Sequence, residues 1–382
     1  MLYLDTAATT PVRREALEAA WPYLTGTFGN PSSHHTVGEA AARGLEDARR
    51  RVAAVLGARR SDIVFTASGT EAANLAIRGL ALATPRGKHL VTAPTEHEAV
   101  LESISFLQRV HGFEVSFVDV GADGIVTPEA LRAVLRADTT LVSLALANNE
   151  IGAIADIPAL AAAAHETGAL LHTDAVQAAG WVDLRDLGAD ALTISGHKLG
   201  APKGIGVAAI RGRLPLEPLV HGGGQENGRR SGTENVAFAV ALAVALELSE
   251  AERAQKVARI GPLRDAFLAR VLTAREGVLL TGPPAAETGP DGRSARLPAH
   301  ASFCVPGLSG ESVLLDLEER GVVASSGSAC AAGSDEPSHV LTALGISREV
   351  AQTAVRFTLG AEVSAAQLDA AALAVEEVLA AT

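Results

Sequence analysis

The chain has 382 residues, of which 48% are hydrophobic and 20% are charged, and its formal net charge is −12. This composition predicts a soluble globular protein with two domains, and the acidic balance argues against a nucleic-acid-binding surface. Two cysteines cannot form a disulfide framework, and the start "MLYLDTAATTPVRREALEAA" lacks the pattern of a signal peptide, so we expect a cytoplasmic protein with no membrane contact.

Strand and helix patterns alternate through the first 210 residues. Apolar runs that predict strands occupy 62–67, 88–93, 114–120, 139–147, 169–174, 190–195 and 206–211. Helical patterns follow the first four of these runs, at 70–82, 97–110, 127–136 and 157–168. Thr127 is placed to cap the third of these helices, with Pro128 as its first residue. Because the strands lack polar alternation, they predict an α/β fold with a mostly parallel seven-stranded sheet and helices on both faces.

The pattern changes from about Thr233 onward. A long helical stretch at 234–260 is typical of a bridge between domains. Beyond it, strand patterns at 301–307 and 355–360 and a helical pattern at 310–321 indicate a smaller α+β unit. We therefore expect a large domain over 13–255, and a small domain formed by 1–12 and 256–382.

Chemically useful side chains follow successive predicted strands. They comprise hydroxyl and small residues, a histidine, amides, an acid and a lysine: Gly69, Thr70, His97, Asn149, Asp174, Gln177, Ser195, His197 and Lys198. Taken singly, most of them also fit helix caps or surface positions. Together they lie where an open α/β sheet binds ligands, beyond the carboxyl ends of its strands.

Lysine is rare in this chain, since only four of the 32 basic residues are lysines: Lys88, Lys198, Lys203 and Lys256. Unlike arginine, lysine can lose its proton and act as an amine nucleophile. A rare lysine, an acid, a ring-shaped side chain and an anion cradle suit pyridoxal 5'-phosphate, whose aldehyde forms a Schiff base with lysine. No GxGxxG follows the first strand and no GxxxxGK[ST] is present, which weakens a dinucleotide or P-loop reading; no metal is expected.

The two cysteines have different surroundings. Cys330 lies in "SSGSACAAGS", among small and polar residues, whereas Cys304 lies in the apolar strand pattern "ASFCVPG". A cysteine without apolar neighbours is a candidate nucleophile, and one in an apolar strand is expected in the core.

Several stretches resemble the cysteine desulfurases, pyridoxal-phosphate enzymes of fold type I in the class V aminotransferase family that serve iron–sulfur cluster assembly. The resemblance spans nearly the whole chain and rests on "YLDTAATTP", "GNPSSHH", "TASGTEAANLAI", "TEHEAV", "NNEIG", "HTDAVQ", "SGHKLGAPKGIG", "GGGQENGRRSGTENV", "SSGSAC" and "VRFTLG". "SGHKLGAPKGIG" and "GGGQENGRRSGTEN" are specific for the superfamily branch, and "SSGSAC" singles out the desulfurases.

The resemblance implies a role for each residue. Lys198 would form the internal aldimine, Asp174 would pair with the pyridine nitrogen, and Gln177 would bind the phenolic oxygen. His97 would stack on the ring and move protons. The phosphate would be bound by Gly69, Thr70, Ser195 and His197. Thr233 would reach the phosphate of the other subunit of a homodimer. The substrate carboxylate would be held by Asn149 and Arg356.

The reaction implied by the resemblance takes sulfur from L-cysteine, giving L-alanine and a persulfide on Cys330. His97 is a candidate base for the Cys330 thiol. The persulfide would pass to sulfur-acceptor proteins such as an iron–sulfur scaffold or a tRNA-thiolation protein. This chain departs from the family pattern at two places. Thr6 stands where asparagine is frequent, and the sequence "ASGTEAAN" around Thr70 differs from the commoner one.

Other readings of the same residues remain. A selenocysteine lyase or an aminotransferase-like relative would use the same cofactor. A thiol hydrolase or transferase with a cysteine–histidine dyad would explain Cys330 but would leave Lys198 and Asp174 without a role. A non-catalytic relative would not need the lysine, the acid and the cysteine together. The sequence does not distinguish selenocysteine from cysteine as substrate, and it does not name the acceptor.

Overall fold

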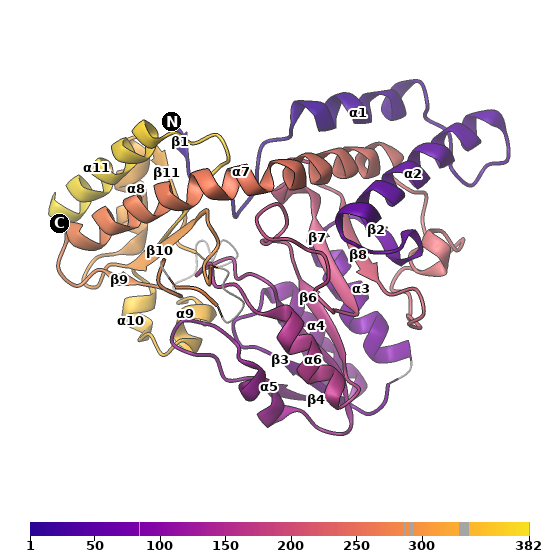
Figure 1. Ribbon diagram of the computed structural model, residues 1–382, viewed down its shortest axis with the longest axis horizontal. Helices are drawn as coiled ribbons and strands as arrows, with labels where there is room; N and C mark the ends of the chain where they lie inside the picture. The colour runs from indigo at the N-terminus through magenta and orange to yellow at the C-terminus, as the bar shows by residue number, and fades with distance from the viewer. Residues whose placement is uncertain (84, 286, 290–293, 328–335, 382) are drawn as a thin grey trace.

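The computed structural model describes residues 1–83, 85–285, 287–289, 294–327 and 336–381. Figure 1 shows two units at opposite ends of the molecule. One contains the large sheet and its helices, the other is smaller, and one long helix runs over both. Both chain termini lie at the smaller unit.

The large sheet has seven strands in the order β2-β8-β7-β6-β5-β3-β4. Strands β3 to β7 pair in parallel, and β8 runs antiparallel to both β7 and β2. The strands are β2 Ile63–Thr66, β3 His89–Thr92, β4 Glu114–Phe117, β5 Thr139–Ala145, β6 Leu170–Asp174, β7 Ala191–Ser195 and β8 Gly206–Ile210. The connection from β7 to β8 carries Lys198 and is too short for a helical crossover, so the second strand returns antiparallel.

Helices cover both faces of this sheet because successive strand residues point to opposite sides. Ile63 and Phe65 of β2 belong to the core cluster under α2, α6 and the first half of α7 (Val236–Ala274), whereas Val64 between them packs with α3 and α4 on the other face. The helices are α1 Arg14–Thr25, α2 Thr36–Val55, α3 Gly69–Ala83, α4 Glu98–His111, α5 Pro128–Val134 and α6 Ile157–Glu166.

The smaller unit is built around a three-stranded sheet of order β12-β10-β9 and a short pair of β1 with β11. Its core joins Leu4, the second half of α7 and the strands β10 and β12. The elements are β1 Leu2–Tyr3, α7 Val236–Ala274, β9 Leu279–Leu280, β10 His300–Cys304, α8 Gly310–Glu319, β11 Val322–Val323, α9 His339–Ala343, α10 Arg348–Ala351, β12 Ala354–Thr358 and α11 Ala365–Ala381.

The predicted fold class is confirmed, and the predicted elements appear within a few residues of their expected bounds, except that the helix expected at 234–260 continues to Ala274. Thr127 caps α5, as expected, by accepting a hydrogen bond from the Ala130 amide. Cys304 is fully buried, as its apolar setting predicted, and burial raises the pKa of its thiol to about 11. The division into domains at residues 12/13 and 255/256 stays a prediction.

Candidate active site

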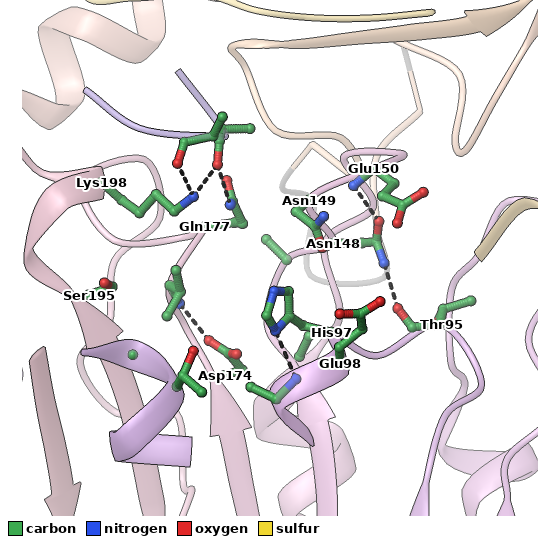
Figure 2. A pocket seen from close by; sticks show the side chains of 18 of the residues that line it. Thr95, His97, Glu98, Asn148, Asn149, Glu150, Asp174, Gln177, Ser195 and Lys198 are labelled. Carbon is green, nitrogen blue, oxygen red and sulfur yellow. Dashed lines mark hydrogen bonds between the residues drawn. The ribbon is translucent and has the colours of Figure 1, made fainter. Parts of the chain in front are cut away.

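A cavity of about 730 Å³ opens beyond the carboxyl ends of the parallel strands. The structure brings ten predicted residues to its wall: Gly69, Thr70, His97, Asn149, Asp174, Gln177, Ser195, His197, Lys198 and Arg356. Figure 2 shows Lys198 and Gln177 on one side and Asn149 on the other, with Asp174 and His97 below them in this view. Thr233 is exposed and does not line this cavity, and Cys330 lies outside the described residues.

One end of the cavity is suited to an anion. Helix α3 begins at Gly69, where an added Cβ would lie only 3.0 Å from Ser195 Cβ and from Val176 Cγ2. The glycine therefore leaves the helix N-terminus open, where backbone N–H groups and the helix dipole favour negative charge. The hydroxyls of Thr70 and Ser195 line the same end. These groups fit the phosphate of a bound cofactor.

His197 is a neutral donor beside this cradle. Burial, together with the nearby positive charges of Lys198 and Lys203, lowers the pKa of its ring to about 4. Its Nδ1 lies 3.1 Å from the hydroxyl of Thr9. A neutral imidazole can still donate one N–H, so His197 can hydrogen-bond to a phosphate without carrying charge.

Lys198 lies in a single turn after β7 and projects its amine toward the cavity. Its Nζ donates hydrogen bonds to the backbone carbonyls of Ala7 and Ala8, the second at 2.8 Å (Figure 2). Gln177 Nε2 donates to the same Ala7 carbonyl at 3.1 Å. The lysine and the glutamine thus meet at the N-terminal segment, a contact that the sequence did not predict.

Asp174 ends β6 at the floor of the cavity. Burial raises the pKa of its carboxyl, while a hydrogen bond from the Val176 amide and the charges of His97 and Lys198 act in the opposite direction. That amide donates to Oδ1 at 2.9 Å. A carboxylate in such a setting gains from a cationic partner, which a protonated pyridine nitrogen would supply.

His97 caps helix α4 with its ring. Its Nδ1 accepts a hydrogen bond from the Ala99 amide at 3.0 Å. A neutral His97 in this arrangement carries its proton on Nε2, so a further proton can enter only at Nδ1 and would break the cap. That His97 activates Cys330 remains a prediction. In this role His97 would give up the hydrogen bond that its Nδ1 accepts from the Ala99 amide.

Arg356 is buried, and one of its side-chain nitrogens, Nε, has no partner among the described residues. Its side chain is only 2% exposed. Nη1 donates to the carbonyls of Asn149 at 3.0 Å and Gly327 at 2.6 Å, and Nη2 donates to Asp5 Oδ1 at 2.8 Å. An unsatisfied N–H of a guanidinium lining a cavity suits a carboxylate.

The two asparagines of "ANNEIG" have different surroundings. Asn148 is buried. Its side chain accepts from the amides of Glu150 and Ile151 in its own loop and donates to the Thr95 carbonyl, which lies between β3 and α4. Asn149 lines the cavity, as predicted for a substrate-binding residue. The contact that ties it to Arg356 is through its backbone carbonyl.

Sequence reasoning missed the polar groups that brace this cavity. Ser338 donates to Glu150 Oε2 at 2.5 Å, and His339 Nε2 lies 2.9 Å from the Glu96 carbonyl. Asp5 pairs with Arg356 across the length of the chain. The motif "YLDTAATTP" pointed to the segment around Asp5, but none of these pairings leaves a local pattern in the sequence.

Glu96 is a buried acid next to the cavity. Oε1 accepts from the Ala145 amide at 2.9 Å, and Oε2 has no partner among the described residues. Burial raises the pKa of this carboxyl from 4.5 to about 8; the hydrogen bond from Ala145 opposes the shift and the charge of Asp174 adds to it. The folded chain therefore holds a proton there that the unfolded chain releases, and stability falls as the pH rises from about 4.5 to about 8.

Replacing Glu96 with glutamine is expected to remove this decline, because glutamine matches the protonated acid in shape and does not ionise. Relative to the unchanged chain, Glu96→Gln gains roughly 2–4 kcal/mol of unfolding free energy between pH 5 and pH 8. Urea unfolding at both pH values measures it, with Glu102→Gln on the exposed side of α4 as control. A Glu96→Gln variant with the same pH slope as the unchanged chain would refute the buried proton.

Comparison with known proteins agrees with this geometry. The family model "Aminotransferase class-V" matches residues 2–371. This chain belongs to the class-V aminotransferase family. Enzymes of this family use pyridoxal phosphate, and the cavity residues provide the cradle, acid and amine that this group needs. The family and cofactor predicted from the sequence are therefore confirmed.

Two curated relatives carry a narrower name than the family, and two solved structures are similar in fold. "Cysteine desulfurase IscS" of Dictyoglomus turgidum is 44% identical over 362 residues, covering 94% of this chain and 89% of that protein. "IscS-like cysteine desulfurase" of Mycobacterium tuberculosis is 40% identical, covering 97% of this chain and 94% of that protein. A solved "NifS-like protein" is 33% identical with a TM-score of 0.90, and each chain is covered in full. "SspA in complex with cysteine" is 34% identical with a TM-score of 0.78, covering 94% and 99% of the two chains.

Two further features, a membrane-spanning helix and a metal-binding cluster, are absent from the described ranges. No helix there is both long and apolar enough to cross a membrane. No group of three or more histidine, cysteine or acidic side chains in those same ranges is arranged to hold a metal ion.

Proposed function

We propose that this chain is a cysteine desulfurase that takes sulfur from L-cysteine and leaves L-alanine, with the sulfur carried as a persulfide on Cys330. The observation that carries the proposal is the cavity itself. It combines an amine on Lys198, an acid on Asp174 and a buried guanidinium with an unsatisfied N–H on Arg356. A thiol hydrolase with a cysteine–histidine dyad would have no use for these three groups.

Each group has a defined task in the proposed reaction. Pyridoxal phosphate, when bound, supplies a ring that withdraws electrons from the substrate's α-carbon. Arg356 and Asn149 hold the substrate carboxylate, which fixes the α-hydrogen relative to Lys198. The Lys198 amine removes that hydrogen as a proton, and Asp174 keeps a positive charge at the ring nitrogen.

The sulfur then moves from substrate to enzyme. The Cys330 thiolate attacks the substrate's sulfur, so that an S–S bond forms and the substrate's C–S bond breaks. The electron pair of the broken bond stays with the substrate's β-carbon, which takes up a proton. Lys198 then returns the proton to the α-carbon, and this step completes L-alanine. The persulfide passes its outer sulfur to an acceptor protein, for which an iron–sulfur scaffold or a tRNA-thiolation protein has suitable chemistry.

The active unit in this proposal is a homodimer. Thr233 is exposed and lies outside the cavity of its own chain, which suits a residue that reaches the phosphate of the other subunit. Arg230, three residues earlier, pairs with Glu71 in the first turn of α3 at 2.8 Å. Because of this ion pair, the "GRRSGTEN" segment lies beside the anion cradle. Sedimentation of the cofactor-loaded protein measures its oligomeric state and so tests the proposed dimer.

Arg356→Lys is expected to raise the KM for L-cysteine about 10–100-fold, with a smaller effect on kcat. Lysine keeps the charge but lacks the planar group that holds Gly327, Asn149 and Asp5 while leaving Nε for a carboxylate. Steady-state kinetics measures the effect, and Arg348→Lys, in the exposed pair with Glu336, is the matched control. An unchanged KM in Arg356→Lys would remove Arg356 from carboxylate binding.

A further inference from the structure

The N-terminal segment Asp5–Thr10, here called the strap, touches four residues of the candidate active site. It contacts Arg356, Lys198, Gln177 and His197, which come from two different parts of the chain. None of the roles proposed above uses the strap. It holds no titratable group other than Asp5, yet it connects the proposed carboxylate site with the proposed amine.

At one end the strap is fixed to β12 and to Arg356. Asp5 Oδ1 accepts from Arg356 Nη2 at 2.8 Å, and the two side chains are only 16% and 2% exposed. The Ala7 amide donates to the Thr358 hydroxyl at 2.8 Å, and Thr6 Oγ1 donates to the Leu359 carbonyl. The position of Asp5 is therefore set by the strand that carries Arg356.

At its other end the strap contacts the turn Gly196–Lys198. The Ala7 and Ala8 carbonyls accept from Lys198 Nζ. The Thr10 amide and hydroxyl both donate to the His197 carbonyl, at 3.0 and 2.8 Å. The Ala8 amide donates to the Asp5 carbonyl at 3.0 Å, closing a turn between the two ends. Asp5 is thus joined by a backbone hydrogen bond to the residues whose carbonyls face Lys198.

The strap also has space behind it. A second cavity, of about 670 Å³, lies on its far side, and both cavities are lined by Ala7, Gln177 and Lys198. The strap borders both cavities. Hydrogen bonds along its length join it to Thr358, Gln177, His197 and Lys198.

We propose that the strap is a positioning element that couples Arg356 to Lys198. Asp5 holds the guanidinium so that its Nε faces the substrate carboxylate, and the carbonyls of Ala7 and Ala8 receive the lysine amine whenever it is free of the cofactor. A substrate that occupies Arg356 and releases Lys198 depends on both ends together. This inference rests on the proposed function only for the role of Arg356 as the carboxylate group.

Two ligands that differ only in an amine group test the Arg356 end and the Lys198 end of the strap separately. L-alanine offers a carboxylate and an amine that can displace Lys198, and propionate offers the carboxylate alone. Binding of L-alanine to the cofactor-loaded protein is followed by the visible spectrum, and propionate by competition with L-alanine. Neither measurement requires release of sulfur, so a failure of the strap is distinguishable from a failure of the proposed desulfurase activity.

Asp5→Ala is expected to weaken propionate binding about 10-fold and L-alanine binding about 100-fold, because the second ligand also needs the Ala7 and Ala8 carbonyls in place. Asp5→Asn keeps an oxygen that accepts from Arg356 Nη2 and is expected to restore both affinities to within about threefold. Should Asp5→Ala fail to fold, Asp5→Ser, whose hydroxyl is too short to reach the guanidinium, replaces it.

Glu252→Gln is the matched control. Glu252 pairs with Arg13 just beyond the strap, at 2.7 Å, but it contacts none of the four site residues. Its loss is expected to leave both affinities unchanged. Equal weakening of the two ligands in Asp5→Ala would overturn the coupling, as would unchanged affinities, or the same losses in Glu252→Gln.

Discussion

Lys198→Ala is expected to abolish the visible absorption of covalently held pyridoxal phosphate and to lower sulfur release from L-cysteine by at least about 10³-fold. No other amine lines the first cavity among the described residues. The variant loses both the covalent attachment of the cofactor and the base that moves the α-proton. Absorption spectra of the purified protein and a sulfide assay measure the two losses separately.

Lys203→Ala is the control for this change. Lys203 lies five residues further along the same connection between β7 and β8, but it is exposed and does not line the cavity. It should keep both the colour and the turnover. A Lys198→Ala protein that stays yellow and turns over fully would show that this lysine has neither role.

Cys330→Ser is expected to keep the cofactor and to stop sulfur release, lowering it by at least about 10³-fold. A serine hydroxyl is a poor nucleophile toward sulfur and cannot hold a persulfide. Mass spectrometry of the protein after incubation with L-cysteine should find one added sulfur in the unchanged chain and none in the variant.

Cys304→Ala tests whether the other cysteine can substitute. Cys304 is fully buried, and burial raises the pKa of its thiol to about 11, so its thiolate is scarce at neutral pH. Its replacement should cost some stability and leave the added sulfur in place. An added sulfur that persists in Cys330→Ser and disappears in Cys304→Ala would reverse the assignment.

Much of the cavity wall was predictable because its residues lie at or just after the ends of strands. Asp174 and Ser195 end β6 and β7, Lys198 follows β7, and parallel strands bring their carboxyl ends to one edge of a sheet. The cap at Thr127 was predictable for a similar reason, since the hydroxyl and the following proline form a local pattern.

The strap and the length of α7 were not predictable in this way. Asp5 bonds to Arg356 and Ala7 bonds to Thr358, and the residues of each pair are 351 positions apart in the sequence. No local sequence pattern predicts a contact over such a separation. Helix α7 was expected to end near residue 260, but it continues through Pro262 to Ala274. Residues such as Phe267 pack into the core of the smaller unit, and that burial outweighs the proline.

Incubating the purified, cofactor-loaded protein with L-cysteine and a thiol reductant, and assaying L-alanine and sulfide together, tests the central proposal most directly. A cysteine desulfurase releases the two products in a one-to-one ratio, because each broken C–S bond yields one alanine and one transferred sulfur. Absence of alanine, or pyruvate and ammonia in its place, would contradict the proposed reaction.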